Sequence, residues 1–196
     1  MPNNNSLLLP PDEPPVRADA RRNRELLLDT AKKLFEAEGV EAVSMTAIAD
    51  TAGVGKGTLY RHFDNKADVC NALLDEDQRR LQNAVLQHMA EQSHTPPEKT
   101  HWFLEQILRF VLKNVSLLSV EEDAVGIGLE HPAHYWWRQT LLGLLQRQLP
   151  GEDVSYRADV LYVMLDVRTI QFQQRMGYDE AQILSGLQDT ADRLST

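Results

Sequence analysis

The sequence has little cysteine and no long apolar run. Its 196 residues include a single cysteine, Cys70, which excludes a disulfide framework within the chain and a cysteine-rich zinc site. No apolar stretch reaches the roughly 18–20 residues that a membrane-spanning helix needs, and residues 107–115 are interrupted by Arg109 and Lys113. The first nine residues contain no lysine or arginine, so they do not resemble a secretory signal. We therefore expect a cytoplasmic protein without a membrane partner.

Positive charge is also scarce, and its distribution is uneven. The chain carries 20 basic and 29 acidic residues, a formal charge of −9 at pH 7, which argues against a general nucleic-acid-coating protein. Residues 1–15 carry −2, residues 16–63 carry +1 and residues 64–196 carry −8. The stretch 16–63 is thus the only one that would not repel a polyanion. This pattern fits either chance variation along the chain or a small nucleic-acid-facing module on an acidic body.

Apolar residues recur mostly at helical spacing, and no stretch shows sustained strand alternation. The sequence therefore predicts an all-α fold. Five of the nine prolines lie within residues 1–15, which favours a flexible tail. The segments predicted to be helical are approximately 18–38, 45–52, 56–63, 66–92, 97–118, 121–130, 132–148, 153–176 and 179–194.

Two of these helices are short and lie on either side of a glycine-containing turn. Ser44 occupies the position of an N-cap for the first helix, and Gly53-Val54-Gly55 separates it from the second. This is the spacing of a helix-turn-helix. Spacing alone leaves open whether the motif binds DNA or is an ordinary corner of an all-α protein.

The residues themselves carry a more specific signal. The runs SMTAIA at 44–49 and AGVGKGTLYRHF at 52–63, followed by Asn65 and Lys66, resemble the TetR (tetracycline-repressor-like) family of transcriptional regulators. The resemblance covers residues 20–70. After a tail at 1–17 that the composition predicts to be disordered, the resemblance implies a three-helix DNA-binding domain with a helix-turn-helix at 18–66 and a helical ligand-binding and dimerisation domain at 67–196. Gly55 departs from the family pattern, in which many members have serine or another polar residue, so a side-chain contact is absent there.

The resemblance and the physics of groove recognition together indicate the DNA-binding residues. A recognition helix reads bases from its first turns and holds its register through phosphate contacts. Lys56 can donate to guanine O6 or N7, and Gly57 would let the backbone approach DNA. Arg21, Arg22 and Arg24 fit either DNA contact or a solvated basic cluster. The candidate DNA-binding residues are Ser44, Thr46, Lys56, Gly57, Thr58, Tyr60, Arg61, His62 and Lys66.

Aromatic residues are rare before residue 100 and common after it. Ten of the 13 lie in the second part, where they could line an apolar ligand pocket. For each of them, a place in the core or at a dimer interface is the alternative. Trp137 is one further aromatic candidate. The candidate ligand-binding residues are Trp102, Phe103, Phe110, Tyr135, Trp136, Tyr162, Arg168 and Phe172.

Arg168 shares a helical stripe with Leu161, Leu165 and Phe172 in the predicted helix 153–176. We therefore expect a buried guanidinium, which needs a carboxylate, a subunit-interface partner or an anionic ligand. Our hypothesis is that an anionic effector pairs with Arg168, and a salt bridge is the alternative.

The final predicted helix carries a narrow apolar seam. The seam consists of Leu184, Leu187, Ala191 and Leu194, which would either pack internally or form an association surface. The family resemblance implies a homodimer with a four-helix interface. A two-fold protein reads a palindromic DNA site with half-sites about 34–36 Å apart, or multiples of that spacing.

The sequence offers little support for catalysis or metal binding. We find no nucleophile–base pair, phosphate loop or metal cluster, so we expect no enzyme activity, no cofactor and no metal site. His131 and His134 are three residues apart but lack a clear third ligand. We expect a ligand-responsive, sequence-specific transcriptional regulator, a repressor that a small-molecule effector releases from a palindromic operator. The alternatives are a helical small-molecule carrier or enzyme without a DNA role, and a purely structural interaction protein.

Overall fold

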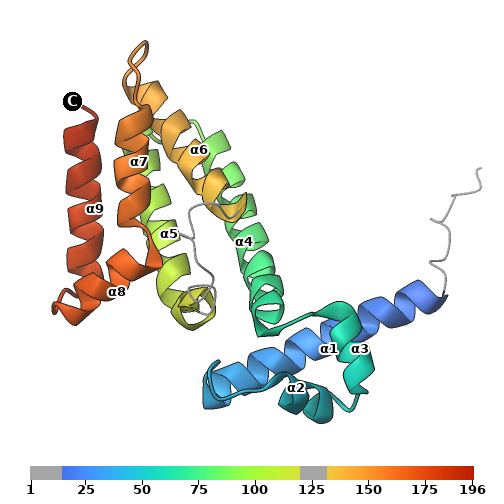
Figure 1. Ribbon diagram of the computed structural model, residues 1–196. Helices are drawn as coiled ribbons and strands as arrows, with labels where there is room; N and C mark the ends of the chain where they lie inside the picture. The colour runs from blue at the N-terminus through green and yellow to red at the C-terminus, as the bar shows by residue number, and fades with distance from the viewer. Residues whose placement is uncertain (1–14, 120–131) are drawn as a thin grey trace, which may run out of the picture. The chain divides into compact units, whose positions relative to one another are not determined.

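The computed structural model describes residues 15–119 and 132–196, and their regular structure is helical without a strand (Figure 1). The all-α prediction is confirmed. No helix in these two ranges is long and apolar enough to cross a bilayer. The tail at 1–14 and the predicted helix at 121–130 lie outside the described residues. The helices are α1 (Pro15–Glu38), α2 (Met45–Ala52), α3 (Lys56–His62), α4 (Lys66–Ala90), α5 (Pro96–Leu118), α6 (Pro132–Gln148), α7 (Ser155–Met164), α8 (Val167–Arg175) and α9 (Glu180–Leu194).

One predicted helix is in fact two. Residues 153–176 form α7 and α8, which are separated at Leu165 and Asp166. The Asp166 side chain accepts a hydrogen bond from the backbone N–H of Arg168 at 2.9 Å, and so caps α8 at its start. The break changes the helical phase, and Arg168 is exposed rather than buried. The prediction of a buried guanidinium was therefore wrong.

The chain divides into two compact units, and the boundary falls after Val69, inside α4. In the first unit α1 contacts both α2 and α3. Leu27 on α1, Ile48 on α2 and Leu59 on α3 are fully buried, and Phe63 closes the core at the end of α3. The predicted boundary, after residue 66, lies three residues earlier in the same helix.

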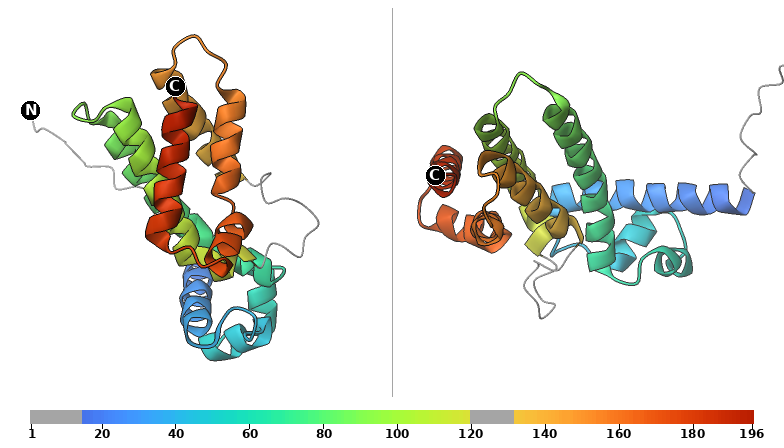
Figure 2. Two further views of the ribbon diagram at one scale, coloured as in Figure 1. Left: turned by 90° about the vertical axis from the view of Figure 1, so that its left-hand side faces the viewer. Right: turned by 90° about the horizontal axis from the view of Figure 1, so that it is seen from above.

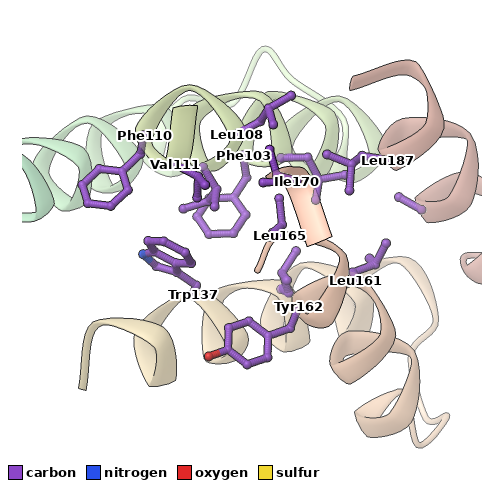
Figure 3. Packing of buried hydrophobic residues seen from close by; sticks show 14 of the residues in the cluster. Phe103, Leu108, Phe110, Val111, Trp137, Leu161, Tyr162, Leu165, Ile170 and Leu187 are labelled. Atoms are coloured by element: carbon purple, nitrogen blue, oxygen red, sulfur yellow. The ribbon is translucent and has the colours of Figure 1, made fainter. Parts of the chain in front are cut away.

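The second unit is a bundle in which α5 contacts α6, α8 and α9, and α7 contacts α6 and α9 (Figure 2). Its core includes Phe103 and Leu108 from α5, Trp137 from α6, Leu161 from α7 and Leu187 from α9 (Figure 3). Apolar side chains of α4 belong to the same cluster. The elements that carry the aromatic residues are thus packed on one another in a single core.

The apolar seam of α9 belongs to this core. Leu187 and Ala191 are each only 1% exposed, and Leu184 and Leu194 are partly buried against the same cluster. Internal packing was one of the two alternatives for the seam. In the structure, the seam packs against the core of its own chain. Leu187 and Ala191 are thus used by the fold of a single chain, whereas an association role for the partly buried Leu184 and Leu194 stays a prediction.

Candidate nucleic-acid interface

Local backbone chemistry sets the geometry of the helix-turn-helix. Ser44 Oγ accepts a hydrogen bond from the backbone N–H of Ala47 at 3.1 Å and thereby caps α2, as predicted. Gly53 ends α2 in the left-handed region with φ of 69°, which favours glycine because it lacks a Cβ. Gly55 precedes α3 and provides no side-chain cap. The sequence therefore fixes a sharp turn between α2 and α3.

The two faces of α3 differ in burial. Leu59 is fully buried and Phe63, directly after the helix, is 3% exposed, so they anchor α3 in the first unit. Gly57, Tyr60 and Arg61 lie at positions i, i+3 and i+4, on the side away from Leu59, and all three are exposed. Tyr60 is 49% exposed, so its ring is not simply part of the core packing.

The remaining predicted DNA-binding residues of the helix-turn-helix differ in exposure. Lys56, in the first turn of α3, is exposed, as is Ser44. Thr46, Thr58 and His62 are half-buried. An ideal Cβ placed on Gly57 would meet no atom within 4 Å, so the surface beside it is open. The arrangement offers a rigid helix with a lysine, a tyrosine and an arginine accessible to a duplex.

Lys66 has a structural role that sequence reasoning missed. Its ammonium group donates to the carbonyl oxygens of Val40, at 2.8 Å, and Glu41, at 3.2 Å, in the turn between α1 and α2. Asn65 Oδ1 accepts from the backbone N–H of Asp68 at 3.0 Å and caps α4. These contacts tie the start of α4 to the helix-turn-helix unit. Phosphate binding by Lys66 stays a prediction, since two bonds leave one ammonium N–H for a further acceptor.

The arginines at the start of α1 have partners within their own unit. The Arg24 guanidinium lies over the Phe63 ring, 5.3 Å from its centroid, and covers the end of α3. The exposed side chains of Arg21 and Arg22 each lie 3.8 Å from a carboxylate of α1. Such exposed pairs are weak and readily exchange a carboxylate for a phosphate. DNA contact from this cluster stays a prediction.

The predicted ligand-binding residues occupy different environments in the second unit. Phe103, Phe110 and Tyr162 are buried, and burial, reinforced by the charge of Asp166, raises the pKa of Tyr162. Trp102 and Trp136 are half-buried. These five residues belong to or pack against the single core cluster of the second unit, and their role in a ligand site stays a prediction. The predicted residues that are exposed are Tyr135, Arg168 and Phe172.

A buried glutamine is the main residue that the sequence analysis missed. Gln78 on α4 is 6% exposed, and its Oε1 accepts a hydrogen bond from Trp137 Nε1 at 3.1 Å. An indole N–H can only donate, so it requires the amide oxygen to face it. Gln78 Nε2 is then left without a partner among the described residues. The sequence signal was its place on an apolar stripe of α4, with Leu74 and Leu81 at i−4 and i+3.

Comparisons with known proteins agree with this architecture. Residues 27–73 match the family described as bacterial regulatory proteins, tetR family. An HTH-type transcriptional regulator of Staphylococcus aureus is 37% identical over 162 residues, which cover 81% of this chain and 85% of that protein.

Solved structures share the fold at lower identity. A transcriptional regulator of the TetR/AcrR family from Thermobifida fusca has a TM-score of 0.60 and 20% identity, over 89% of this chain and 97% of that one. A transcriptional regulator from Pseudomonas aeruginosa has a TM-score of 0.64 and 16% identity, over 89% and 91%. Together with the capped helix-turn-helix and the helical second unit, these relationships show that the chain belongs to the tetR family of bacterial regulatory proteins and is a DNA-binding transcriptional regulator, not an enzyme.

Proposed function

We propose that this regulator is a cytoplasmic homodimeric repressor that binds a palindromic operator through α3 and is released by a small-molecule effector. The observation that carries the proposal is the two-sided character of α3. Leu59 is fully buried on one side, while Lys56, Tyr60 and Arg61 are exposed. A helix held in this way can enter the major groove without disturbing the core beneath it.

The exposed residues have distinct expected roles on DNA. Lys56, at the start of α3, donates to a guanine edge, which makes its contribution sequence-dependent. Arg61 and His62 contact phosphate oxygens and hold the helix in register. Ser44, Thr46 and Thr58 lie close enough in sequence to supply additional hydrogen bonds from α2 and α3. The −8 charge of residues 64–196 favours dissociation once the fit to DNA is lost.

The dimer surface that we propose lies on α8 and the turn that follows it. Phe172, Met176 and Tyr178 are 56%, 64% and 54% exposed in the single chain. Large apolar side chains that gather on a surface are typical of protein–protein interfaces. Phe172, predicted from the sequence to line the ligand site, is therefore reassigned to this surface.

The effector site that we propose is centred on Gln78. A buried amide N–H without an acceptor costs free energy, which an effector with a carbonyl, ether or hydroxyl oxygen would recover. Trp137, which fixes the amide orientation, has its ring 5.4 Å from that of Phe110 in an edge-on arrangement. The site therefore favours a ligand that combines an aromatic or apolar body with a hydrogen-bond acceptor.

Release would follow from differential affinity for two geometries of the dimer. An effector shifts the population only as far as its binding differs between the two. Gln78 and Lys66 lie on the same helix, α4, and Lys66 is bonded to the α1–α2 turn. A shift of α4 on effector binding would in this way reach the helix-turn-helix unit.

Selection from a random DNA pool tests the function directly. The wild-type protein should enrich a palindromic sequence, and its affinity should fall steeply as salt rises. Lys56→Ala should relax base choice at one position of each half-site. Arg193→Ala removes the same charge from an exposed position of α9 and should leave the enriched sequence unchanged. If the pool shows no enrichment with or without added ligands, the alternative of a helical carrier is favoured.

A further inference from the structure

Two histidines and a glutamate meet where α4 ends and the loop to α5 begins. His88 lies in the last turn of α4, and Glu91 and His94 follow in the loop. One oxygen of Glu91, Oε2, lies 3.8 Å from His88 Nδ1 and 3.1 Å from His94 Nε2. The ligand atoms of the three side chains all lie within 4.8 Å of one another. No part of the DNA-binding function uses this cluster.

The spacing of these atoms is close to that of a metal site. A tetrahedral zinc ion with bonds of about 2.0–2.2 Å separates its ligand atoms by about 3.3–3.5 Å. The two distances to Glu91 Oε2 bracket this value. The third pair of ligand atoms, those of His88 and His94, must come closer together to reach this spacing. His94 can move toward His88 because it lies in a loop rather than in a helix.

The surroundings hold one histidine in place and leave the other adjustable. His88 is 14% exposed and stacks between the rings of Trp102, at 4.0 Å, and His94, at 4.7 Å. Imidazole lone pairs lie in the ring plane, so two stacked rings cannot share an ion until one of them tilts. His94 is 37% exposed and is the ring that can tilt, while Trp102 keeps His88 fixed.

The charge balance around the cluster favours a cation. Glu91 is in the cluster, and Glu98 lies nearby, where hydrogen bonds from Thr95 and, to a smaller extent, the charge of His94 lower its pKa. Glu98 itself is occupied in the capping box of α5, where it accepts from the Thr95 backbone N–H at 2.6 Å. Among the described residues, Lys99 brings a positive charge to this loop, and its ammonium donates to the backbone carbonyls of Met89 at 2.9 Å and Glu91 at 2.5 Å.

From this geometry we propose that His88, Glu91 and His94 bind one divalent transition-metal ion of the zinc class. Two imidazole nitrogens and one carboxylate oxygen suit Zn²⁺, Ni²⁺, Co²⁺ or Cu²⁺, whereas Mg²⁺ and Ca²⁺ prefer oxygen ligands alone. A fourth position is open to water or to a ligand from solution. The bound ion clamps the end of α4 to the loop that starts α5, and so stabilises the second unit.

The test is a direct titration of the full chain, without a histidine tag, with Zn²⁺ alone. Isothermal titration calorimetry should show one ion per chain, and the same ion should raise the unfolding temperature. His94→Ala and Glu91→Gln should each weaken binding at least about tenfold, since even outer-shell changes cost 10–100-fold. His94 and Glu91 are loop residues, so both variants should keep the wild-type circular dichroism. Mg²⁺ should produce no heat above dilution.

Two controls separate this site from other histidines. His101→Ala changes a histidine that pairs with Asp192 at 2.7 Å and is not one of the three proposed ligands, and it should leave zinc binding intact. His134→Ala tests the pair with His131 that sequence spacing suggested. The proposal is overturned if wild-type protein binds Zn²⁺ no tighter than the His88→Ala/His94→Ala double variant, or if His134→Ala, and not His94→Ala, removes binding.

Discussion

The ammonium group of Lys66 lies 2.8 Å from the carbonyl oxygen of Val40, so the first residue of α4 is bonded to the turn between α1 and α2. The family resemblance links this lysine with DNA phosphates. The structure adds that the same ammonium group closes the helix-turn-helix unit, with Glu41 O as its second acceptor. Loss of Lys66 therefore has two separable consequences, one for folding and one for DNA binding.

Lys66→Ala should destabilise the protein by about 1–2 kcal/mol, because two backbone carbonyls lose a charged donor. Denaturant unfolding followed by circular dichroism measures this change, and fluorescence anisotropy measures DNA affinity, which should weaken for all sequences alike. Lys56→Ala is the matched control and should keep wild-type stability, since Lys56 is exposed at the start of α3. Full stability with weakened DNA binding in Lys66→Ala would show that the carbonyl contacts contribute nothing.

Gly57→Ala should separate the folding of α3 from its approach to DNA. An alanine Cβ meets open space, and alanine is favoured over glycine in a helix by roughly 0.5–1 kcal/mol. Stability should therefore stay the same or rise, while affinity for the selected operator should fall because the methyl group faces the duplex. Unchanged operator affinity would mean that the α3 backbone does not come close to DNA at this position.

Met176→Glu should convert the proposed dimer into monomers and reduce operator affinity. Met176 is 64% exposed, so the substitution should leave the fold of each chain intact while it places a charge in an apolar interface. Sedimentation velocity gives the oligomeric state. Leu86→Glu, on α4 at 65% exposure, is a control of equal chemistry outside the surface and should remain dimeric. If the Met176→Glu variant stays dimeric, the dimer interface does not lie at the end of α8.

Gln78→Met should abolish the response to effector and lower stability by about 1–3 kcal/mol, because the buried Trp137 Nε1–H loses this acceptor. Methionine fills a similar volume, and it removes the amide nitrogen that has no partner among the described residues. A thermal-shift screen should find acceptor-bearing compounds that stabilise wild-type protein but not this variant. Gln148→Met is the control, because its amide already donates to Thr100 Oγ1 at 2.9 Å. If compounds stabilise both variants equally, the effector does not contact Gln78.

Local interactions explain which parts of the molecule were predictable. Ser44 as the cap of α2, Gly53 as its left-handed end and Thr95 with Glu98 as the capping box of α5 depend on neighbours within a few residues. Such contacts leave a direct trace in the sequence. The position of Leu59 in the core and of Tyr60 outside it likewise follows from helical periodicity.

Burial beyond one helix was harder to predict. Helical periodicity places Arg168 on a buried stripe only if residues 153–176 form one continuous helix. The helix is in fact broken at Asp166, whose side chain caps α8. Leu187 appeared available for association because the sequence does not say whether α5 or a second chain covers that face. The meeting of His88, Glu91 and His94 depends on how the loop after α4 folds back, which helical spacing does not describe.

Most of the helices, the cap at Ser44, the motif at 44–63 and, through that motif, the family could be predicted from the amino-acid sequence. Those features arise from interactions between residues close in the chain, whose energies are nearly independent of the rest of the molecule. Tertiary structure alone decided the second carbonyl partner of Lys66, the orientation of the Gln78 amide against Trp137, and which apolar faces remain outside. These three features depend on contacts between segments that are far apart in the sequence. Local helix propensity does not specify such contacts, because sequences with the same propensities can pack different residues together.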